Sequence, residues 1–159
     1  MTITPDPSGI RPLTPMAPTP YHRWDWASRT FLPDVAAAKA DARQKVDELR
    51  AQKSYAPIDY AGANFDADAL SRERISGSIL RLLRGDGLPT GWLGWRDADN
   101  VMRWGSATEA QVQAHLRNLS AAIEDREQYL LIKAWTKKAQ IDALPTVEAV
   151  LAYDLMAGW

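Results

Sequence analysis

The sequence predicts an α+β fold: a small, mostly helical domain with short β-hairpins and one long C-terminal helix, preceded by an extended proline-rich arm. Apolar residues recur at helical spacing in several stretches, and polar or glycine-containing turns separate short runs of β-formers. Six of the ten prolines lie within the first 20 residues. The 159 residues therefore divide into an arm (1–20), a Trp-rich strand or hairpin segment (21–33) and a single α+β domain (34–159).

The composition excludes several classes of function. Lysine plus arginine total 19 and aspartate plus glutamate 20, so the chain lacks the basic excess of a duplex nucleic-acid binder. The chain has no cysteine, which excludes disulfides, thiolate nucleophiles and Cys-based zinc sites. No apolar run approaches the roughly 20 residues that span a bilayer, and the N-terminus does not resemble a secretion signal. We therefore expect a soluble cytoplasmic product that binds neither nucleic acid nor membrane.

The arm carries prolines at spacings of two to five residues, which prevent both a helix and a central strand. Because proline fixes φ, the arm has polyproline-II character and loses little conformational entropy on binding. Its apolar side chains are too sparse for a core but suit shallow pockets on a partner. These side chains are Ile3, Ile10, Leu13 and Met16. A solvated tail is the alternative interpretation.

Residues 21–33 predict a short hairpin that turns at 27–29. Trp24 and Trp26 lie two residues apart, which on a strand places both rings on one face. The residues around this segment offer little core in which the two rings could be buried, and tryptophan is enriched at interface hot spots. We therefore expect at least one ring to bury against another subunit, supported by Phe31.

From residue 34 the apolar spacing changes to three and four, which predicts a helix to about residue 53 with Asp34 as its N-cap. A second hairpin is predicted over residues 55–66. A second helix is predicted over residues 68–84, where Gly85 provides a left-handed stop.

The clearest hairpin joins residues 92–96 to 101–104 through a polar turn. Its tryptophans are interpreted as core aromatics on a small sheet.

The longest periodic segment follows a capping box at residues 106–109 and predicts a helix of roughly 35 residues, about 50 Å long. Such a helix exceeds what a small domain covers, so we expect part of it to self-associate or pack on a partner. The apolar spacing resembles a heptad seam with a gap at Arg126, which marks a kink or a boundary between packing surfaces. The seam consists of Val112, Leu116, Leu119, Ile123 and Leu130. Pro145 ends the helix, and Thr146 caps a short last helix.

No group of residues predicts catalysis. His22 and His115 are interpreted as surface or packed side chains, because His22 lies beside a Trp-rich segment and His115 falls within helical periodicity. The carboxylates on predicted helices lie among arginines at ion-pairing spacings. Residues 97–100 resemble the opening of a calcium loop but lack its glycine and its final glutamate. We therefore expect no enzyme, no metal and no cofactor.

Several segments, taken in order, resemble a known family. They are AAAKADARQKVDELRAQ, IDYAGANFDAD, ISGSILRLLRGDGLP, WLGWRDADNVMRW and the LPTVEAV that ends the long helix. Over residues 36–150 this order resembles an uncharacterised domain family recurrent in tail proteins of tailed bacteriophages. The upstream WDWASRTFLPD resembles the sequence that precedes this domain in phage tail-fibre and fibre-assembly proteins. The family has no established catalytic residues to carry over.

The resemblance implies a setting rather than a reaction. It implies a structural component of the virion tail (baseplate, tail tip or fibre attachment), assembled in the host cytoplasm. Its partners would be other baseplate or fibre subunits, and a homo-oligomer is compatible with the long helix. The alternative is a non-virion chaperone that holds fibre subunits until they trimerise. A tail-tip cell-wall hydrolase would need a metal site or paired carboxylates that the sequence does not supply.

We predict that the arm makes most of its contacts outside its own chain. Deleting residues 1–20 should therefore change the free energy of unfolding by less than about 1 kcal/mol, because surface segments contribute little. The same deletion should abolish incorporation into the particle. Thermal unfolding of the truncated and full chains measures the first effect, and a large loss would show that the arm belongs to the fold.

Overall fold

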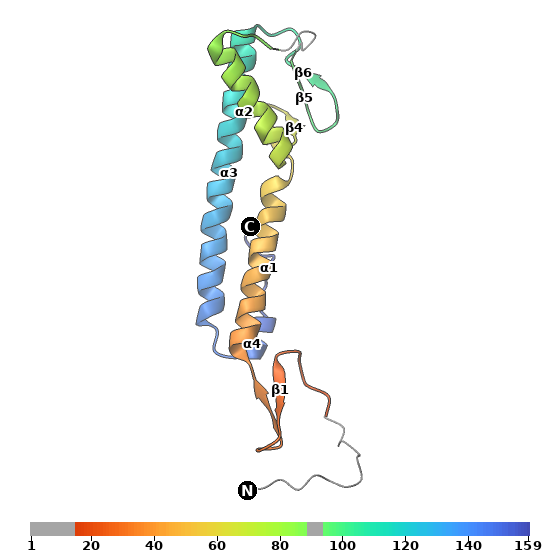
Figure 1. Ribbon diagram of the computed structural model, residues 1–159, viewed down its shortest axis with the longest axis vertical. Helices are drawn as coiled ribbons and strands as arrows, with labels where there is room; N and C mark the ends of the chain where they lie inside the picture. Colours follow the sequence, from red (N-terminus) through yellow and green to blue (C-terminus); the bar gives the residue numbers. More distant parts are fainter. Residues whose placement is uncertain (1–14, 89–93) are drawn as a thin grey trace.

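The computed structural model describes residues 15–88 and 94–159, and within them it confirms the α+β fold (Figure 1). Long helices form most of this part, and each pair of strands is a separate antiparallel hairpin. In chain order the elements are β1 (His22–Asp25), β2 (Thr30–Pro33), α1 (Val35–Tyr55), β3 (Ile58–Tyr60), β4 (Ala63–Phe65), α2 (Ala69–Arg84), β5 (Trp95–Arg96), β6 (Met102–Arg103), α3 (Glu109–Ala143) and α4 (Val147–Leu151).

Most helix ends carry the signals that the sequence predicts. Asp34 accepts a hydrogen bond from the Ala37 N–H at the start of α1, and Asp68 accepts one from the Ser71 N–H at the start of α2. Gly85 ends α2 in the left-handed conformation, with φ of 79°.

The capping box of α3 corrects the prediction. The cap is Thr108 with Gln111, two residues after the predicted pair at Ser106 and Glu109.

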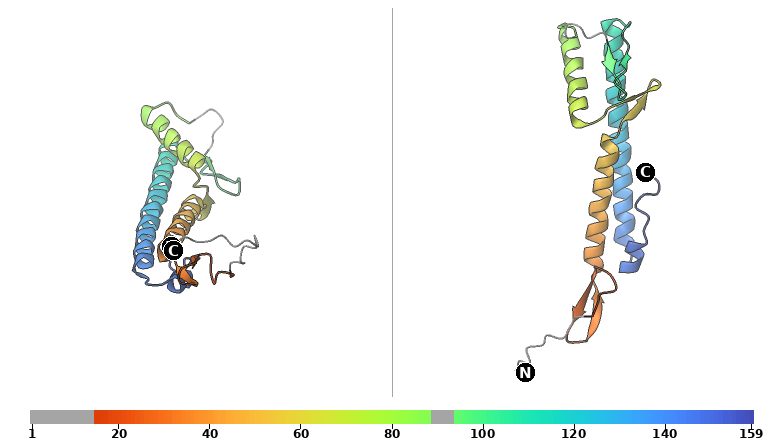
Figure 2. Two further views of the ribbon diagram at one scale, coloured as in Figure 1. Left: turned by 60° about the horizontal axis from the view of Figure 1, so that its bottom comes forward. Right: turned by 90° about the vertical axis from the view of Figure 1, so that its right-hand side faces the viewer.

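Helix α3 is the spine of the molecule. Its 35 residues extend about 52 Å at 1.5 Å per residue, and α2 and α1 follow one another along it (Figures 1 and 2). Helix α2 packs on the N-terminal half of α3, and α1 packs on the C-terminal half together with α4. The helix is continuous through Arg126 and Glu127, so the predicted kink is wrong, whereas the alternative prediction of a boundary between two packing surfaces is confirmed.

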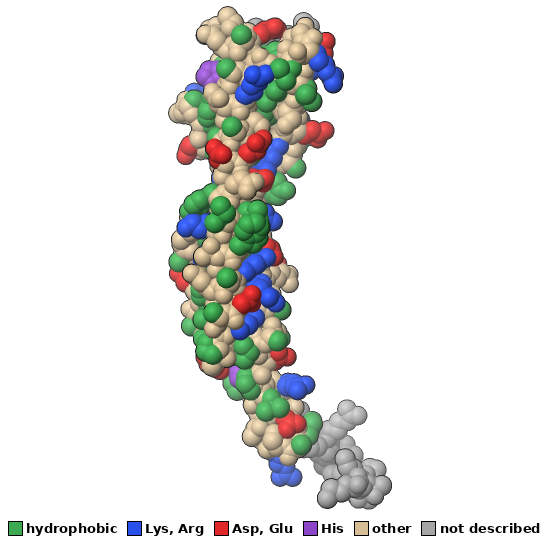
Figure 3. Space-filling view, turned by 90° about the vertical axis from the view of Figure 1, so that its left-hand side faces the viewer, with side chains coloured by type: hydrophobic (Ala, Val, Ile, Leu, Met, Phe, Trp, Pro, Cys, Tyr) green, Lys and Arg blue, Asp and Glu red, His purple; other side chains and the backbone are tan. Residues whose placement is uncertain are grey.

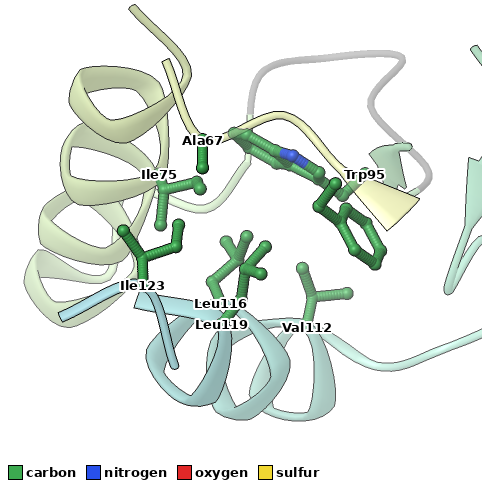
Figure 4. Packing of buried hydrophobic residues seen from close by; sticks show 8 residues of the cluster. Ala67, Ile75, Trp95, Val112, Leu116, Leu119 and Ile123 are labelled. Atoms are coloured by element: carbon green, nitrogen blue, oxygen red, sulfur yellow. The ribbon is translucent and has the colours of Figure 1, made fainter. Parts of the chain in front are cut away.

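Two separate hydrophobic cores lie along α3. The first core joins the N-terminal half of α3 to α2 and to the two hairpins that follow α1 (Figure 4). Its buried members are Phe65, Ala67, Ile75, Trp95, Val112, Leu116, Leu119 and Ile123. The second core joins the C-terminal half of α3 to α1 and α4. Its buried members are Ala38, Ala42, Val46, Ala134, Ile141, Val147 and Val150.

A polar junction lies where α1 ends and α2 begins. The guanidiniums of Arg72 and Arg126 both donate to the Ser54 backbone carbonyl, each at 2.7 Å. Arg72 also pairs with the Glu127 carboxylate at 2.5 Å, and the Ser54 hydroxyl donates to the same carboxylate oxygen. Ser54 lies in the last turn of α1, where carbonyls have no partner within the helix. The junction therefore satisfies the end of α1 and ties α1, α2 and α3 together.

We predict that Leu116→Ala lowers the free energy of unfolding by about 3 kcal/mol. Leu116 is fully buried in the first core, and truncating such a side chain leaves a cavity. The matched control is Leu83→Ala on the exposed side of α2, which should change stability by less than about 0.5 kcal/mol. Urea unfolding of both variants measures the difference, and equal losses would contradict this assignment of the core.

We predict that acid destabilises the junction through Glu127. Hydrogen bonds from the Ser54 hydroxyl and from Arg72 lower the pKa of this carboxyl. Its folded pKa lies below the unfolded value of about 4.3, so the stabilisation is present above that value and is lost as pH falls through the folded pKa.

Glu127→Gln should therefore make stability less dependent on pH between about 5 and 3 than in the wild type. Urea unfolding at several pH values measures this, with Glu124→Gln, an exposed position on the same helix, as the control. The same pH dependence in Glu127→Gln and wild type would contradict the role of the junction.

Candidate interaction surfaces

The side of α3 opposite its buried face carries an exposed apolar patch. We call Tyr129, Ile132 and Trp135 the outer stripe; their side chains are 49%, 57% and 61% exposed. At 100° per residue, Tyr129 and Trp135 lie about 60° to either side of Ile132. Figure 3 shows this face, with hydrophobic side chains gathered near the middle of the long helix. The three side chains therefore form one surface rather than scattered exposures.

Such a surface favours contact with protein. Single exposed apolar residues are normal, whereas contiguous ones mark interaction sites, and Trp and Tyr are enriched at hot spots. The Lys133 ammonium lies 5.2 Å from the centre of the Tyr129 ring, a cation–π contact within the same helix. The stripe therefore offers two aromatic rings and a β-branched side chain to a partner.

A second surface lies on the β1–β2 hairpin, which projects beyond the end of the helices (Figures 1 and 2). The Trp24 ring meets Trp26 and Phe31 edge-on, with ring centres 6.0 and 5.0 Å apart. Trp26 is 59% exposed, while Trp24 and Phe31 are half-buried. At the base of the hairpin, the Tyr21 hydroxyl donates to Asp41 of α1 at 2.5 Å. The hairpin thus presents Trp26 on a small aromatic cluster fixed to α1.

The structure corrects part of the prediction for these tryptophans. Strand β1 ends at Asp25, so Trp26 lies in the turn and does not share a strand face with Trp24. The two rings pack against each other instead. Burial of Trp26 against another subunit stays a prediction.

The apolar seam predicted to face a partner lies inside the chain. Its five residues are only 0% to 4% exposed, because α1, α2, α4 and the hairpins cover that face of α3. The five are Val112, Leu116, Leu119, Ile123 and Leu130, and as partner-binding residues they are corrected to core residues. Of the predicted arm residues, Met16 is exposed. Ile3, Ile10 and Leu13 lie outside the described residues.

The two histidines occupy packed positions. The His115 ring stacks on Trp104, with ring centres 4.5 Å apart, and Trp104 also stacks on Phe65, with ring centres 5.1 Å apart. His22 Nδ1 lies 2.8 Å from the Thr19 hydroxyl, and its Nε2 lies 3.7 Å from Glu148. Both rings are explained by packing and local hydrogen bonds.

Asp97 organises the β5–β6 turn. Burial opposes ionisation of its carboxyl, but hydrogen bonds from the Val101 N–H and from Arg103 lower its pKa overall. These contacts are typical of a polar turn. Among the described side chains, no group of three His, Cys, Asp or Glu residues is placed to hold a metal ion.

Lys137 is a charged side chain on the buried face of α3. Its ammonium lies 5.5 Å from the Tyr153 ring centre and 5.6 Å from that of Trp159, and burial lowers its pKa. It also donates to the Asp154 carbonyl at 3.4 Å. Lys137 therefore holds the residues after α4 against the helix. Within the described ranges, no helix combines the length and apolar character needed to cross a bilayer.

The outer stripe was not among the surfaces predicted from the sequence. Tyr129 to Trp135 reads YLLIKAW, in which apolar residues point to both sides of a helix. The signal that could have found it is the spacing of three between Tyr129, Ile132 and Trp135, on the side opposite Leu130.

Comparison with known proteins gives a family and no relatives of known structure. A family model described as "Domain of unknown function (DUF4376)" matches residues 37–156. Searches of curated proteins and of solved structures found no match. The matched range contains both cores, the polar junction and the outer stripe, but not the β1–β2 hairpin. Because the match covers well over half of the sequence, the chain belongs to the DUF4376 family.

Proposed function

We propose that this protein is a structural component of a bacteriophage tail, in the baseplate, the tail tip or a fibre attachment point, and that it acts through protein–protein contacts. The observation that carries the proposal is Trp26, a largely exposed ring held on an aromatic cluster at the end of a projecting hairpin. Tryptophan anchors of this kind dominate many protein interfaces. The tail setting itself rests on the resemblance of the sequence segments described above.

The shape of the molecule supports a linking role. Helix α3 alone is about 52 Å long, and the β1–β2 hairpin lies at one end of the bundle while the β5–β6 hairpin lies at the other (Figure 1). A rod with an exposed aromatic surface at one end and a second one along its side can contact two neighbours at once.

The second candidate function is a fibre-assembly chaperone that leaves before the virion is complete. It is favoured by WDWASRTFLPD, which resembles the sequence preceding this domain in fibre-assembly proteins as well as in fibres. This segment forms the β1–β2 hairpin, so the same surface would hold the client. Quantitative mass spectrometry of purified virions separates the two, because a chaperone is absent and a structural component is present in stoichiometric amounts.

We predict that Trp26→Ala reduces incorporation of the chain into particles at least tenfold. A hot-spot tryptophan contributes about 2 kcal/mol or more, which is about thirtyfold in affinity. The fold should persist, because the ring lies largely in solvent, and circular dichroism checks this. The matched control is Leu80→Ala, an exposed apolar residue on α2, which should incorporate like wild type.

Unchanged incorporation of Trp26→Ala would contradict the role of the hairpin. Absence of the wild-type chain from purified virions, combined with loss of fibre trimers when the chain is deleted, would favour the chaperone.

A further inference from the structure

We propose that a second copy of this chain covers the outer stripe, with the two α3 helices antiparallel and their two-fold axis beside Ile132. This inference does not depend on the tail setting, because it concerns only the surface of α3. It identifies the occupant of a surface that no described element of the chain covers (Figures 1 and 3).

The spacing of exposed residues on α3 is that of a helix–helix seam. Along the outer side, exposed positions follow at intervals of four, three, four, three and four residues, as in a heptad pattern. These positions are Ala121, Asp125, Gln128, Ile132, Trp135 and Ala139. Alanines at both ends permit close approach of the two backbones, and the large side chains occupy the middle. The helix therefore carries two seams, one filled by its own chain and one open.

The charge of Asp125 decides the direction of pairing. In a parallel, in-register pair, each Asp125 would face its own copy within the seam, and two like charges would repel at short distance. Ile132 lies seven residues from both Asp125 and Ala139. An antiparallel pair centred on Ile132 therefore sets each Asp125 opposite the uncharged Ala139 of the other copy.

A hydrogen-bond donor is available beside that position. The Tyr153 hydroxyl donates to Gln140 Oε1 at 2.5 Å, which leaves the amide N–H groups of Gln140 without a partner in this contact. Gln140 follows Ala139 and lies about 100° further round the helix, so its amide flanks the seam beside the level that the partner's Asp125 would reach. The antiparallel arrangement thus offers the carboxylate a donor, whereas the parallel arrangement offers it another carboxylate.

The aromatic side chains also fit an antiparallel pair. Tyr129 and Trp135 lie three residues on either side of Ile132 and on opposite flanks of the stripe. In the antiparallel pair, Tyr129 of the second copy lies at the same height along the seam as Trp135 of the first copy. The two rings lie on opposite flanks of the seam, so Tyr129 occupies the side that Trp135 leaves free. Each ring then fills space beside the other, and Ile132 packs against Ile132 at the centre.

The antiparallel pair buries a small area. An antiparallel pair centred on Ile132 overlaps over residues 121–143, about 34 Å, so a strip about 10 Å wide covers on the order of 340 Å² per copy. Stable complexes bury about 800 Å² per partner, so this contact is that of a weak pair whose formation depends on concentration. An exchangeable dimer also explains how a single chain tolerates this apolar face in solution.

Because the chain has no cysteine, disulfide trapping in the full-length protein tests the direction of pairing directly. Ile132→Cys should form a covalent dimer on mild oxidation. A mixture of Asp125→Cys with Ala139→Cys should give a mixed dimer at least about fivefold above either variant alone. Leu83→Cys, exposed on α2, gives the background. Efficient trapping by Asp125→Cys alone would overturn the antiparallel arrangement, and no trapping above background would overturn the dimer.

Sedimentation over about a hundredfold range of concentration around the micromolar range tests the dimer without cysteines. Wild type should pass from monomer to dimer, and Ile132→Glu should remain a monomer with an unchanged circular dichroism spectrum. Leu83→Glu is the matched control and should dimerise like wild type. A wild-type chain that stays monomeric throughout, or an Ile132→Glu variant that still dimerises, would overturn the proposal.

Discussion

Helix α3 buries side chains along one face from Val112 to Ile141, and no other element in the described part of the chain is long enough to cover that face alone. Helices α1 and α2 contain 21 and 16 residues, so the two placed one after the other match its length. This match of lengths determines the division into two cores. It also explains the alanine-rich face of α1, because Ala38 and Ala42 allow α1 and α3 to pack closely where α4 must also fit.

The end of α1, between the two helices that cover α3, leaves backbone carbonyl groups that need hydrogen-bond partners. A helix that ends against another helix leaves carbonyl groups without partners, and burying them costs free energy. The guanidiniums of Arg72 and Arg126 donate to the Ser54 carbonyl, and Glu127 forms an ion pair with Arg72. Arg126 and Glu127, which interrupt the apolar pattern of α3, therefore lie where α1 ends and α2 takes over as the helix packed on α3.

Local features of this fold could be predicted from the sequence, and long-range ones could not. Asp34, Asp68 and Gly85 act through bonds within a few residues, so their roles as caps were predictable. The capping box was misplaced by two residues because Ser106 with Glu109 and Thr108 with Gln111 both have its spacing. Which side of α3 is buried and which side is exposed depends on the distant segments that pack against it, and local patterns do not show this. Periodicity identified the buried seam but could not show that the chain itself fills it, and the mixed run around Leu130 obscured the outer stripe.

The two cores differ in how far apart their parts lie along the chain. The first core is built from residues 65–123, one uninterrupted stretch, whereas the second joins residues 38–46 to residues 134–150. Contacts between nearby residues form fast, and distant ones wait for the intervening chain. During synthesis the first core can close while the last residues are still being added, but α1, although made earlier, stays without its cover until α4 has emerged. Of the described helices, α1 is thus made first, yet its burial is completed last.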